Sequence, residues 1–410
     1  MTELSQTARK ITFILFLAQS LASAGFIASA TVSSILGAEL GGKPWAGVPS
    51  AVFLLGGALA ASVWGVLMDM IGRRNGIALG LLSGVAGAGF VVVAANRSLL
   101  PLMLVGMVLM GFGNAAVVLG RFAAAEVNPP EKRGVAISNV VLGGTAGAIF
   151  GPLLVGPLGE LSLRLGLDEL SGAYIASLVL FGIAAVIVFL GLRPDPREVG
   201  VQVSALYPDS APGGVARPIA VILREPAALA AVTAMVLGQV VMVAIMVITS
   251  LHMKGHNHGL GDISAVISAH TLGMYAFSIV SGRLADKWGR GPVILTGAAT
   301  LLLACLTAPL SPDVLPLAAS LFLLGLGWNF CFVGGSTLLA DQLSPAERAR
   351  TQGVNDLLVG LASAIGSLGS GLVFAATSYT VIALVAGILS LIPLALVLTW
   401  LRRKQVPVGV

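Results

Sequence analysis

Charged residues are scarce in this sequence. Asp, Glu, Lys and Arg together make up 10% of the 410 residues, whereas 57% of them are hydrophobic. The mean hydropathy is +0.97. A water-soluble protein of this length needs several times more charge to cover its surface. A soluble globular fold is therefore excluded.

Cysteine is almost absent as well, with Cys305 and Cys331 as the two examples. Both fall inside apolar runs, so a disulfide framework is not indicated. The formal net charge of +5 does not indicate a nucleic-acid partner, because the basic residues are scattered at the ends of apolar runs. That placement is typical of a membrane topology signal.

The apolar residues form long runs, about as long as the 20 to 25 residues that cross the hydrocarbon core of a bilayer. Such runs must be helical, because every backbone N–H and C=O needs a partner within its own segment. The fold class expected is an all-α membrane protein with twelve spans, near residues 11–36, 48–71, 76–95, 99–127, 134–158, 171–192, 227–251, 262–287, 292–310, 314–343, 349–377 and 381–402.

The first run could instead be a secretory signal, since Arg9 and Lys10 precede it and Ala22-Ser23-Ala24 resembles a cleavage site. The run continues to about Leu36, which is too long for the apolar core of a signal, and its removal would leave an odd number of spans. We interpret it as the first transmembrane helix.

Basic residues predict the orientation. With the N-terminus inside, 18 of the 23 Lys and Arg residues face the cytoplasm, and four face outside, while Arg121 lies within a span. The positive-inside rule then places both termini in the cytoplasm, in a bacterial inner membrane. A linker at 193–225, rich in Pro, Gly and charge, separates an N-terminal half (1–192) from a C-terminal half (226–410).

The two halves are related. The segment from Gly65 to Arg73 (GVLMDMIGR) recurs as Gly282 to Arg290 (GRLADKWGR), each after the second span of its half. Gly111-Phe112-Gly113 followed by Glu126 recurs as Gly325-Leu326-Gly327 followed by Asp341, in the fourth spans. Repeated six-helix halves are typical of secondary carriers.

These repeats resemble the major facilitator superfamily over essentially the whole chain. Its signature Gly-x-x-x-Asp-x-x-Gly-Arg-Arg/Lys is present as Gly65, Asp69, Gly72, Arg73 and Arg74, and a degenerate copy as Gly282, Asp286, Gly289 and Arg290. The resemblance implies a latch for the outward-open state. Arg73 would pair with Glu126, and Arg290 with Asp341. Asp69 would lie by the N-terminus of the eleventh transmembrane span, where a carboxylate meets the positive end of the helix dipole. A merely topogenic charge cluster is the alternative.

The fifth span carries a second motif. Gly143, Gly147, Gly151, Pro152 and Gly156 resemble the antiporter motif of the superfamily, which is found mainly in exporters that exchange substrate for protons. Ordinary close packing between helices is the alternative. Two departures weaken the drug-exporter interpretation, since the first span has no acidic residue in its core and Met107 stands where an arginine is expected.

Ionisable groups within spans are candidates for function. Arg121 could belong to the gate near Glu126, bind an anionic substrate group, or extend to the interface. His270 and Asp356 are candidate proton carriers. The alternatives are a neutral histidine bonded between helices and an aspartate paired with Asn355 or a helix dipole.

Three further histidines, His252, His256 and His258, are expected in an outer loop between spans seven and eight. Their spacing could hold a metal ion, but no cysteine or carboxylate pattern completes such a site, so a solvated loop and no metal are expected. Polar and aromatic residues near mid-span are the candidate cavity residues, in spans that line the path in the family: Gln19, Asn114, Gln239, Trp328 and Asn329, with Arg121.

The sequence therefore predicts a monomeric, proton-coupled carrier that works by alternating access and exports a small amphiphilic organic molecule, with no cofactor and no nucleic-acid partner. A proton-driven importer of an organic anion or vitamin is the second hypothesis. A non-transporting receptor or assembly factor is the third. An enzyme is not expected, because no nucleophile–base pair, metal motif or nucleotide loop is present.

Overall fold

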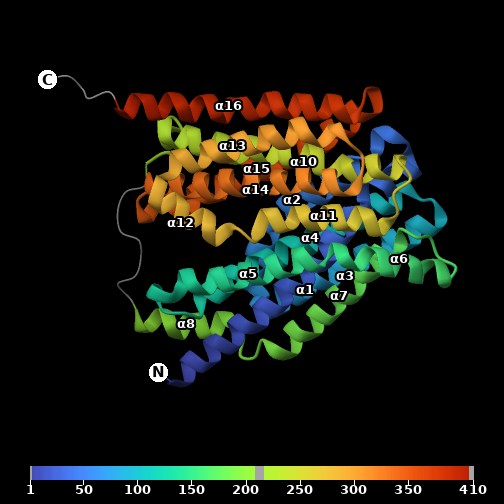
Figure 1. Cartoon of the computed structure of the whole chain (residues 1–410). Helices are drawn as coiled ribbons and strands as arrows, with labels where there is room; N and C mark the ends of the chain where they lie inside the picture. The colour runs from blue at the N-terminus through green and yellow to red at the C-terminus, as the bar shows by residue number, and fades with distance from the viewer. Residues whose placement is uncertain (1, 208–216, 406–410) are drawn as a thin grey trace. The chain divides into compact units, whose positions relative to one another are not determined.

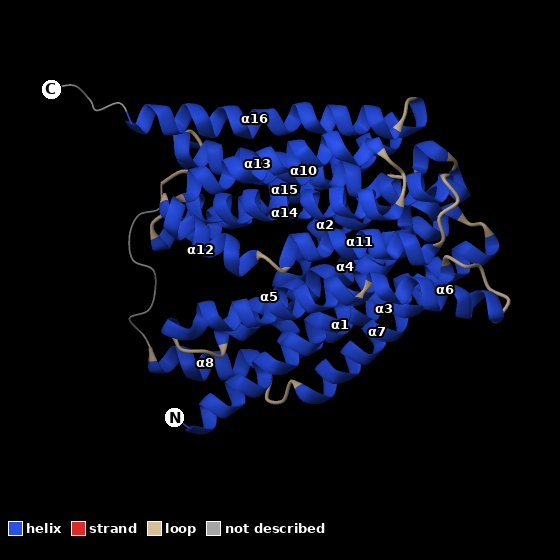
Figure 2. Ribbon diagram, viewed as in Figure 1, coloured by secondary structure: helices blue, strands red, loops and turns tan. Residues whose placement is uncertain are grey.

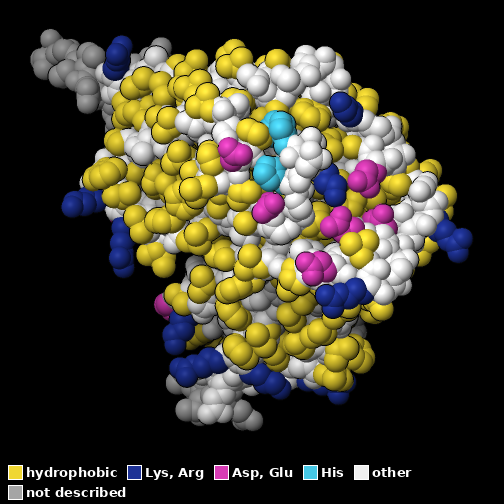
Figure 3. All heavy atoms as spheres, turned by 45° about the vertical axis from the view of Figure 1, so that its right-hand side comes forward, with side chains coloured by type: hydrophobic (Ala, Val, Ile, Leu, Met, Phe, Trp, Pro, Cys, Tyr) yellow, Lys and Arg dark blue, Asp and Glu magenta, His cyan; other side chains and the backbone are white. Residues whose placement is uncertain are grey.

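The computed structural model describes residues 2–207 and 217–405, and within them the regular secondary structure is entirely helical (Figure 2). Twelve segments are long and apolar enough to cross a membrane. The prediction of an all-α protein with twelve spans is confirmed. Hydrophobic side chains cover much of the surface visible in Figure 3, as a lipid-facing surface requires.

The chain divides into two compact units. Unit 1 comprises Met1–Gly42, Val48–Ala211 and Gly259–Ser264, and unit 2 comprises Lys43–Gly47, Pro212–His258 and Ala265–Val410. The linker expected at 193–225 is shared between them, and its residues 208–216, which include the Pro212-Gly213-Gly214 segment, fall outside the described ranges.

The helices of unit 1 appear in blue to green in Figure 1. They are α1 (Thr2–Gly41), α2 (Val48–Ile71), α3 (Arg73–Arg97), α4 (Leu100–Glu126), α5 (Arg133–Phe150), α6 (Val155–Arg164), α7 (Ser171–Gly191) and α8 (Pro196–Leu206). Helix α3 packs against α4 and α7, α2 against α4, and α1 against α5 and α7.

Unit 2 contains α9 (Ile219–Ile222), α10 (Pro226–Gly255), most of α11 (Leu260–Tyr275), α12 (Ser278–Trp288), α13 (Arg290–Thr307), α14 (Val314–Asp341), α15 (Pro345–Ala376) and α16 (Tyr379–Gln405). Helix α13 packs against α14 and α16, α12 against α14, and α10 against α15 and α16. These pairs are the counterparts of those in unit 1, so the sequence repeat is also a repeat of packing.

Two predicted spans are interrupted. The span expected at 134–158 ends as α5 at Phe150, passes through a 3-10 turn at Pro152–Leu154 and resumes as α6. Pro152 lacks the N–H that a continuous helix would use there. The span expected at 262–287 is divided into α11 and α12 at Ala276 and Phe277. Neither of these two residues is a proline or glycine that would predict the break from the sequence.

Local chemistry explains several helix ends. Ser344 and Glu347 form a capping box at the start of α15, and Pro345, between them, occupies the first turn. Gly72 and Gly289 have φ of 89° and 93°, and they separate α2 from α3 and α12 from α13. Only glycine adopts such a conformation without strain, so these two positions set the tight turns of the repeated motif.

Candidate functional site

The repeated charged motif forms an ion-pair network at one end of unit 1. The Arg73 guanidinium donates to both carboxylate oxygens of Glu126, from Nε at 3.0 Å and from Nη2 at 2.7 Å. Its Nη1 lies 2.9 Å from an oxygen of Asp69, one turn earlier on α2. A two-point arginine–carboxylate pair fixes direction as well as distance. The structure thus joins α3 to α4 through the two residues that the sequence pairs.

Unit 2 repeats this arrangement. Arg290 Nε donates to Asp341 at 2.9 Å, and its Nη1 lies 3.1 Å from Asp286 and 2.8 Å from the carbonyl oxygen of Ala285. The side chain of Asp341 is 49% exposed, against 34% for Glu126. Because water screens exposed charges, the pair in unit 2 contributes less to stability than the pair in unit 1.

The first glycine of each motif lies within a helix and not at the turn between helices. Gly65 and Gly282 lie inside α2 and α12, and a Cβ built on either would meet no described atom within 4 Å. The turn between helices depends on Gly72 and Gly289 instead.

Asp195, which the sequence did not single out, completes the network in unit 1. Its carboxylate accepts hydrogen bonds from the backbone N–H groups of Arg73 at 3.1 Å and Arg74 at 3.0 Å. A carboxylate that satisfies the free N–H groups at the start of a helix stabilises it by about 0.5–2 kcal/mol. Gly72 has to be glycine here for a second reason, because a Cβ would lie 2.5 Å from Asp195 Oδ2.

Helix α8 covers this network. Its residue Gly200 faces Glu126, and a Cβ at position 200 would lie 3.2 Å from the Cβ of Glu126. The Asp195-Pro196 pair, an N-cap followed by proline at the first helical position, is a sequence signal for this helix. The contact across more than 70 residues to Glu126 has no such signal.

A second cluster anchors the other end of the linker to unit 2. Arg217 donates to Glu347 at 2.7 Å, to Glu225 at 2.5 Å and to the carbonyl oxygen of Gln342 at 2.8 Å. The bonds from Arg217 and from the Ser344 N–H hold the pKa of Glu347 well below its usual range. The same pair raises the pKa of Arg217. The capping-box spacing of Ser344 and Glu347 is readable in the sequence, but the arginine partner is not.

The glycine motif of the fifth span brings α5 against α1. A Cβ at Gly147 would collide with the carbonyl oxygen of Ser20, and a Cβ at Gly143 or Gly151 with that of Phe16 or Ala24. Gly156 lies beyond the break at Pro152, where it faces Gly261. Gly156 therefore lies apart from the glycines of α5 that face α1.

Side chains from three helices of unit 2 form a cluster. We call it the aromatic cluster and define it as Gln239, Tyr275, Trp328 and Phe332. Trp328 Nε1 donates to Gln239 Oε1 at 2.6 Å, from α14 to α10. The Trp328 ring stacks on Phe332 with centroids 5.0 Å apart, and the Tyr275 ring meets it edge to face at 6.2 Å. All four residues are half-buried. Tyr275 and Phe332 were not predicted.

Asn329, next to Trp328, is buried and spans the break between α11 and α12. Its Nδ2 donates to the carbonyl oxygen of Met274 at 2.6 Å and to Ser278 Oγ at 2.9 Å, and its Oδ1 accepts from Ser281. The amide replaces backbone bonds that the interrupted helix cannot make. These bonds hold the break beside the aromatic cluster, and a place for Asn329 in a substrate cavity stays a prediction.

The predicted cavity residues of unit 1 lie on α1 and α4. Gln19 Nε2 donates to Ser23 on the same helix at 3.1 Å and lies beside Gly144 of α5. The Arg121 guanidinium lies over the ring of Phe122 at 4.9 Å. Asn114 is half-buried on α4.

The two proton candidates differ in environment. His270 is fully buried, and its Nδ1 lies 2.9 Å from the carbonyl oxygen of Leu321. Because a carbonyl only accepts, Nδ1 carries the hydrogen and Nε2 is left as an acceptor, with no partner among the described residues. Asp356 is exposed on α15, whereas its neighbour Asn355 is buried.

His252 belongs to α10 and not to a loop, so that prediction is wrong. Its ring stacks on Tyr379 with centroids 4.3 Å apart, and Tyr379 in turn bonds Thr249 at 2.9 Å. Helix α10 continues past His252 to Gly255. In the described part of the chain, no three or more His, Cys, Asp or Glu residues lie together in a way that could hold a metal ion.

Comparison with known proteins gives consistent matches over the whole length. The family model of the Major Facilitator Superfamily matches residues 13–261 and 230–409. The MFS-type transporter YdeG of Bacillus subtilis is 35% identical over 399 residues, which covers 97% of this chain and 93% of YdeG. The riboflavin transporter RfnT of Brucella anthropi is 28% identical and covers 86% of each chain. The crystal structure of a POT family transporter in complex with 5-aminolevulinic acid superposes with a TM-score of 0.71 at 12% identity, covering 96% of both chains.

Proposed function

Because the chain belongs to the Major Facilitator Superfamily and is a multi-pass membrane transporter, we propose that it exports a small amphiphilic organic solute in exchange for protons. The proposal includes its place in a bacterial cytoplasmic membrane with both termini inside, as the distribution of Lys and Arg favours. It also includes action as a monomer through alternating access.

The observation that carries the substrate class is the aromatic cluster of unit 2. Trp328, Phe332 and Tyr275 offer ring faces, and Gln239 offers an amide beside them. Aromatic faces bind planar apolar groups and cations, while a few placed polar groups orient the ligand. No charged residue belongs to the cluster, which suits an amphiphilic solute better than a small hydrophilic ion.

Two features support the direction. The close packing of Gly143, Gly147 and Gly151 on α1 is the arrangement that the antiporter-like motif requires. The Arg73–Glu126 and Arg290–Asp341 pairs provide one bistable contact in each half, which can break and re-form as the transporter changes state. Under this proposal they are the latch of the outward-open state.

Proton coupling is assigned to His270 or Asp356. His270 has an acceptor nitrogen in a fully buried position, and Asp356 is exposed on a transmembrane helix. Substrate-driven pH change in proteoliposomes tests both, with His270→Gln and Asp356→Asn as variants. Coupling that persists in both single variants and in the double variant would make the assignment wrong.

Transport by purified protein in proteoliposomes tests the main proposal. A panel of lipophilic cations, organic anions and vitamins is presented under an imposed pH gradient, in vesicles of known orientation. We expect uptake into inside-out vesicles when the lumen is acidic. Trp328→Ala should raise the KM for the transported compound about tenfold, Trp328→Phe should change it less, and Phe90→Ala on α3 should leave it unchanged. Accumulation only in right-side-out vesicles would overturn export.

Import of a vitamin is the second candidate, and the similarity to the riboflavin transporter RfnT over 86% of the chain favours it. The aromatic cluster would also suit a planar ring system. Riboflavin uptake into right-side-out vesicles, lost in Arg121→Ala, would establish this candidate. Specific binding without any transport would instead support a receptor on the same scaffold.

A further inference from the structure

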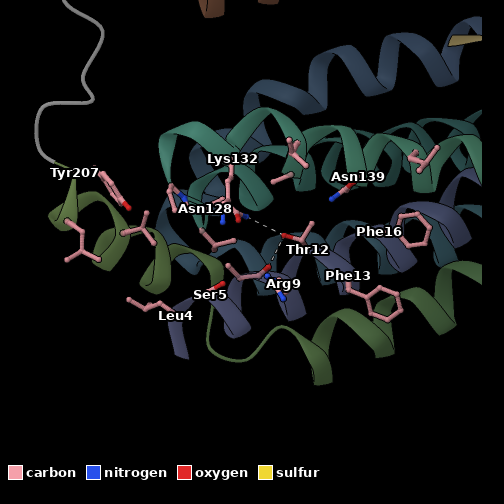
Figure 4. A pocket seen from close by; sticks show the side chains of 18 residues that line it. Leu4, Ser5, Arg9, Thr12, Phe13, Phe16, Asn128, Lys132, Asn139 and Tyr207 are labelled. Carbon is pink, nitrogen blue, oxygen red and sulfur yellow. Dashed lines mark hydrogen bonds between the residues drawn. The ribbon is translucent and has the colours of Figure 1, made fainter. Parts of the chain in front are cut away.

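Unit 1 contains a cavity of about 800 Å³ that the transport proposal does not use. Its walls come from the start of α1, the loop between α4 and α5, the first turns of α5 and the end of α8 (Figure 4). Its size lies within the range of small-molecule sites in proteins. No Asp or Glu lines it, although Arg9 and Lys132 do.

The lining changes from charged to apolar along the helices. On α1, Arg9 is followed by Thr12, then by Phe13 and Phe16, at the spacing that places residues on one helix face. Lys132 is the N-cap of α5, and Asn139 and then Leu142 follow it along that helix. From Arg9 to Phe16 the helix rises about 10 Å, so a ligand that spans this gradient has a charged end and an apolar body.

The internal hydrogen bonds leave the two cations available. Thr12 and Asn128 bond to each other at 3.4 Å and to the carbonyl oxygens of Ala8 and Ala124 at 2.8 Å, so their polar groups are occupied. Arg9 and Lys132 are exposed and have no ion-pair partner among the described residues. Phe13 and Leu142 are 59% and 56% exposed at the other end.

From this geometry we propose that the cavity binds an anionic phospholipid of the cytoplasmic leaflet. The phosphate lies between Arg9 and Lys132, and an acyl chain follows Phe13, Phe16 and Leu142. Charge complementarity selects the anionic headgroup, because basic residues at the inner membrane surface attract anionic lipids. The bound lipid fastens α8 to α1 and α5, on the same helix that covers Glu126.

Binding of acyl-labelled phosphatidylglycerol to the full-length purified protein in neutral detergent tests the proposal, with phosphatidylcholine as competitor. We expect phosphatidylglycerol to be displaced poorly by phosphatidylcholine. Arg9→Gln with Lys132→Gln should weaken its binding roughly 10- to 30-fold, since each basic residue contributes separately. The matched control is Arg224→Gln with Arg402→Gln, which removes two charges outside the cavity. An equal loss in the control, or no preference for phosphatidylglycerol, would overturn the proposal.

A second variant tests the apolar half without changing charge. Asn139→Phe fills the groove from an exposed position, so the fold is retained while the acyl chain is displaced. We expect binding of the long-chain lipid to weaken several-fold. Unchanged binding would contradict the assigned position of the chain.

Competitors separate the sources of the anion. Dihexanoyl phosphatidylglycerol should compete, whereas inorganic phosphate and glycerophosphoglycerol, which lack acyl chains, should not. If the chainless anions compete equally, the site takes a soluble anion and the lipid proposal fails. The readout is binding, so it stays separate from the transport proposal. If the transported solute displaces the lipid competitively, the cavity belongs to the transport path and the lipid proposal is wrong.

Discussion

Arg73 is the residue on which the network of unit 1 depends, because its guanidinium is 19% exposed and serves two carboxylates from different helices. Lysine would keep the charge but offer a single point of contact, and the planar two-point geometry would be lost. The same logic applies in weaker form to Arg290, whose partners are more exposed.

We therefore expect Arg73→Lys to lower the melting temperature of the purified protein by about 2–4 °C, corresponding to the loss of roughly one charged hydrogen bond. It should also reduce the transport rate. Glu126→Gln should have a similar effect, and the double variant should cost less than the sum of the two. Thermal unfolding measured on all three variants checks this. Strict additivity would show that the two residues act independently.

Glu347 gives a prediction about pH. Its pKa is lowered in the folded protein, so its pair with Arg217 stabilises the fold above the ordinary carboxylate pKa, near 4.3, and this contribution is lost as the pH falls further. Glu347→Gln should thus lower the melting temperature at pH 7. The difference from the unmodified protein should shrink as the pH is lowered below about 4.

Melting curves between pH 3.5 and pH 7 measure this difference. Glu131→Gln is the control, since Glu131 is exposed in the loop between α4 and α5. A difference between Glu347→Gln and the unmodified protein that stays constant over the whole range would contradict the assigned pair.

Among whole elements, α5 and α1 approach each other closely through their backbones. The three glycines on α5 let the backbones meet where any side chain would collide with carbonyl oxygens. In a membrane, where lipid is as apolar as leucine, such backbone contact supplies the packing energy between helices. The element therefore tolerates substitution only on its other faces.

Gly147→Ala should destabilise the protein strongly, by about 1–3 kcal/mol as overpacking does, and lower its melting temperature. Gly182→Ala on α7 is the matched control, because a Cβ there meets no atom within 4 Å. That change should be neutral or stabilising, since alanine favours a helix over glycine by about 1 kcal/mol. Equal changes in stability at both positions would show that helix propensity, and not packing, controls the effect of these substitutions.

At the scale of the molecule, the twelve spans and the bias of basic residues predict the topology. A cysteine placed at Gln6 should react with a membrane-impermeant maleimide only from the cytoplasmic side, and one at Asn257 only from outside. The native Cys305 and Cys331 are 1% and 0% exposed, so their background reaction should be slow. Labelling of intact cells and inverted vesicles makes the measurement. Reaction of both positions from the same side would refute the orientation.

The sequence by itself determined the properties that depend on local composition and on repetition. Long apolar runs in a chain with little charge leave transmembrane helices as the solution, because lipid offers no hydrogen bonds. The repeat of Gly65 to Arg73 at Gly282 to Arg290 revealed two related halves. The partners Glu126 and Asp341 were implied by the resemblance of these repeated motifs to the superfamily, and their places in the two fourth spans correspond.

The tertiary structure alone decided the contacts that join residues far apart in the chain. Asp195 reaches the start of α3 across 122 positions, Arg217 reaches Glu347 across 130, and Trp328 reaches Gln239 across 89. None of these pairs has a periodicity or motif that predicts it, because the facing of each helix is set by its packing against several others. The break between α11 and α12, held by Asn329, and the stacking of His252 on Tyr379 arise in the same way. Hydrophobicity therefore fixes which segments are helices, while close packing fixes which side chains meet.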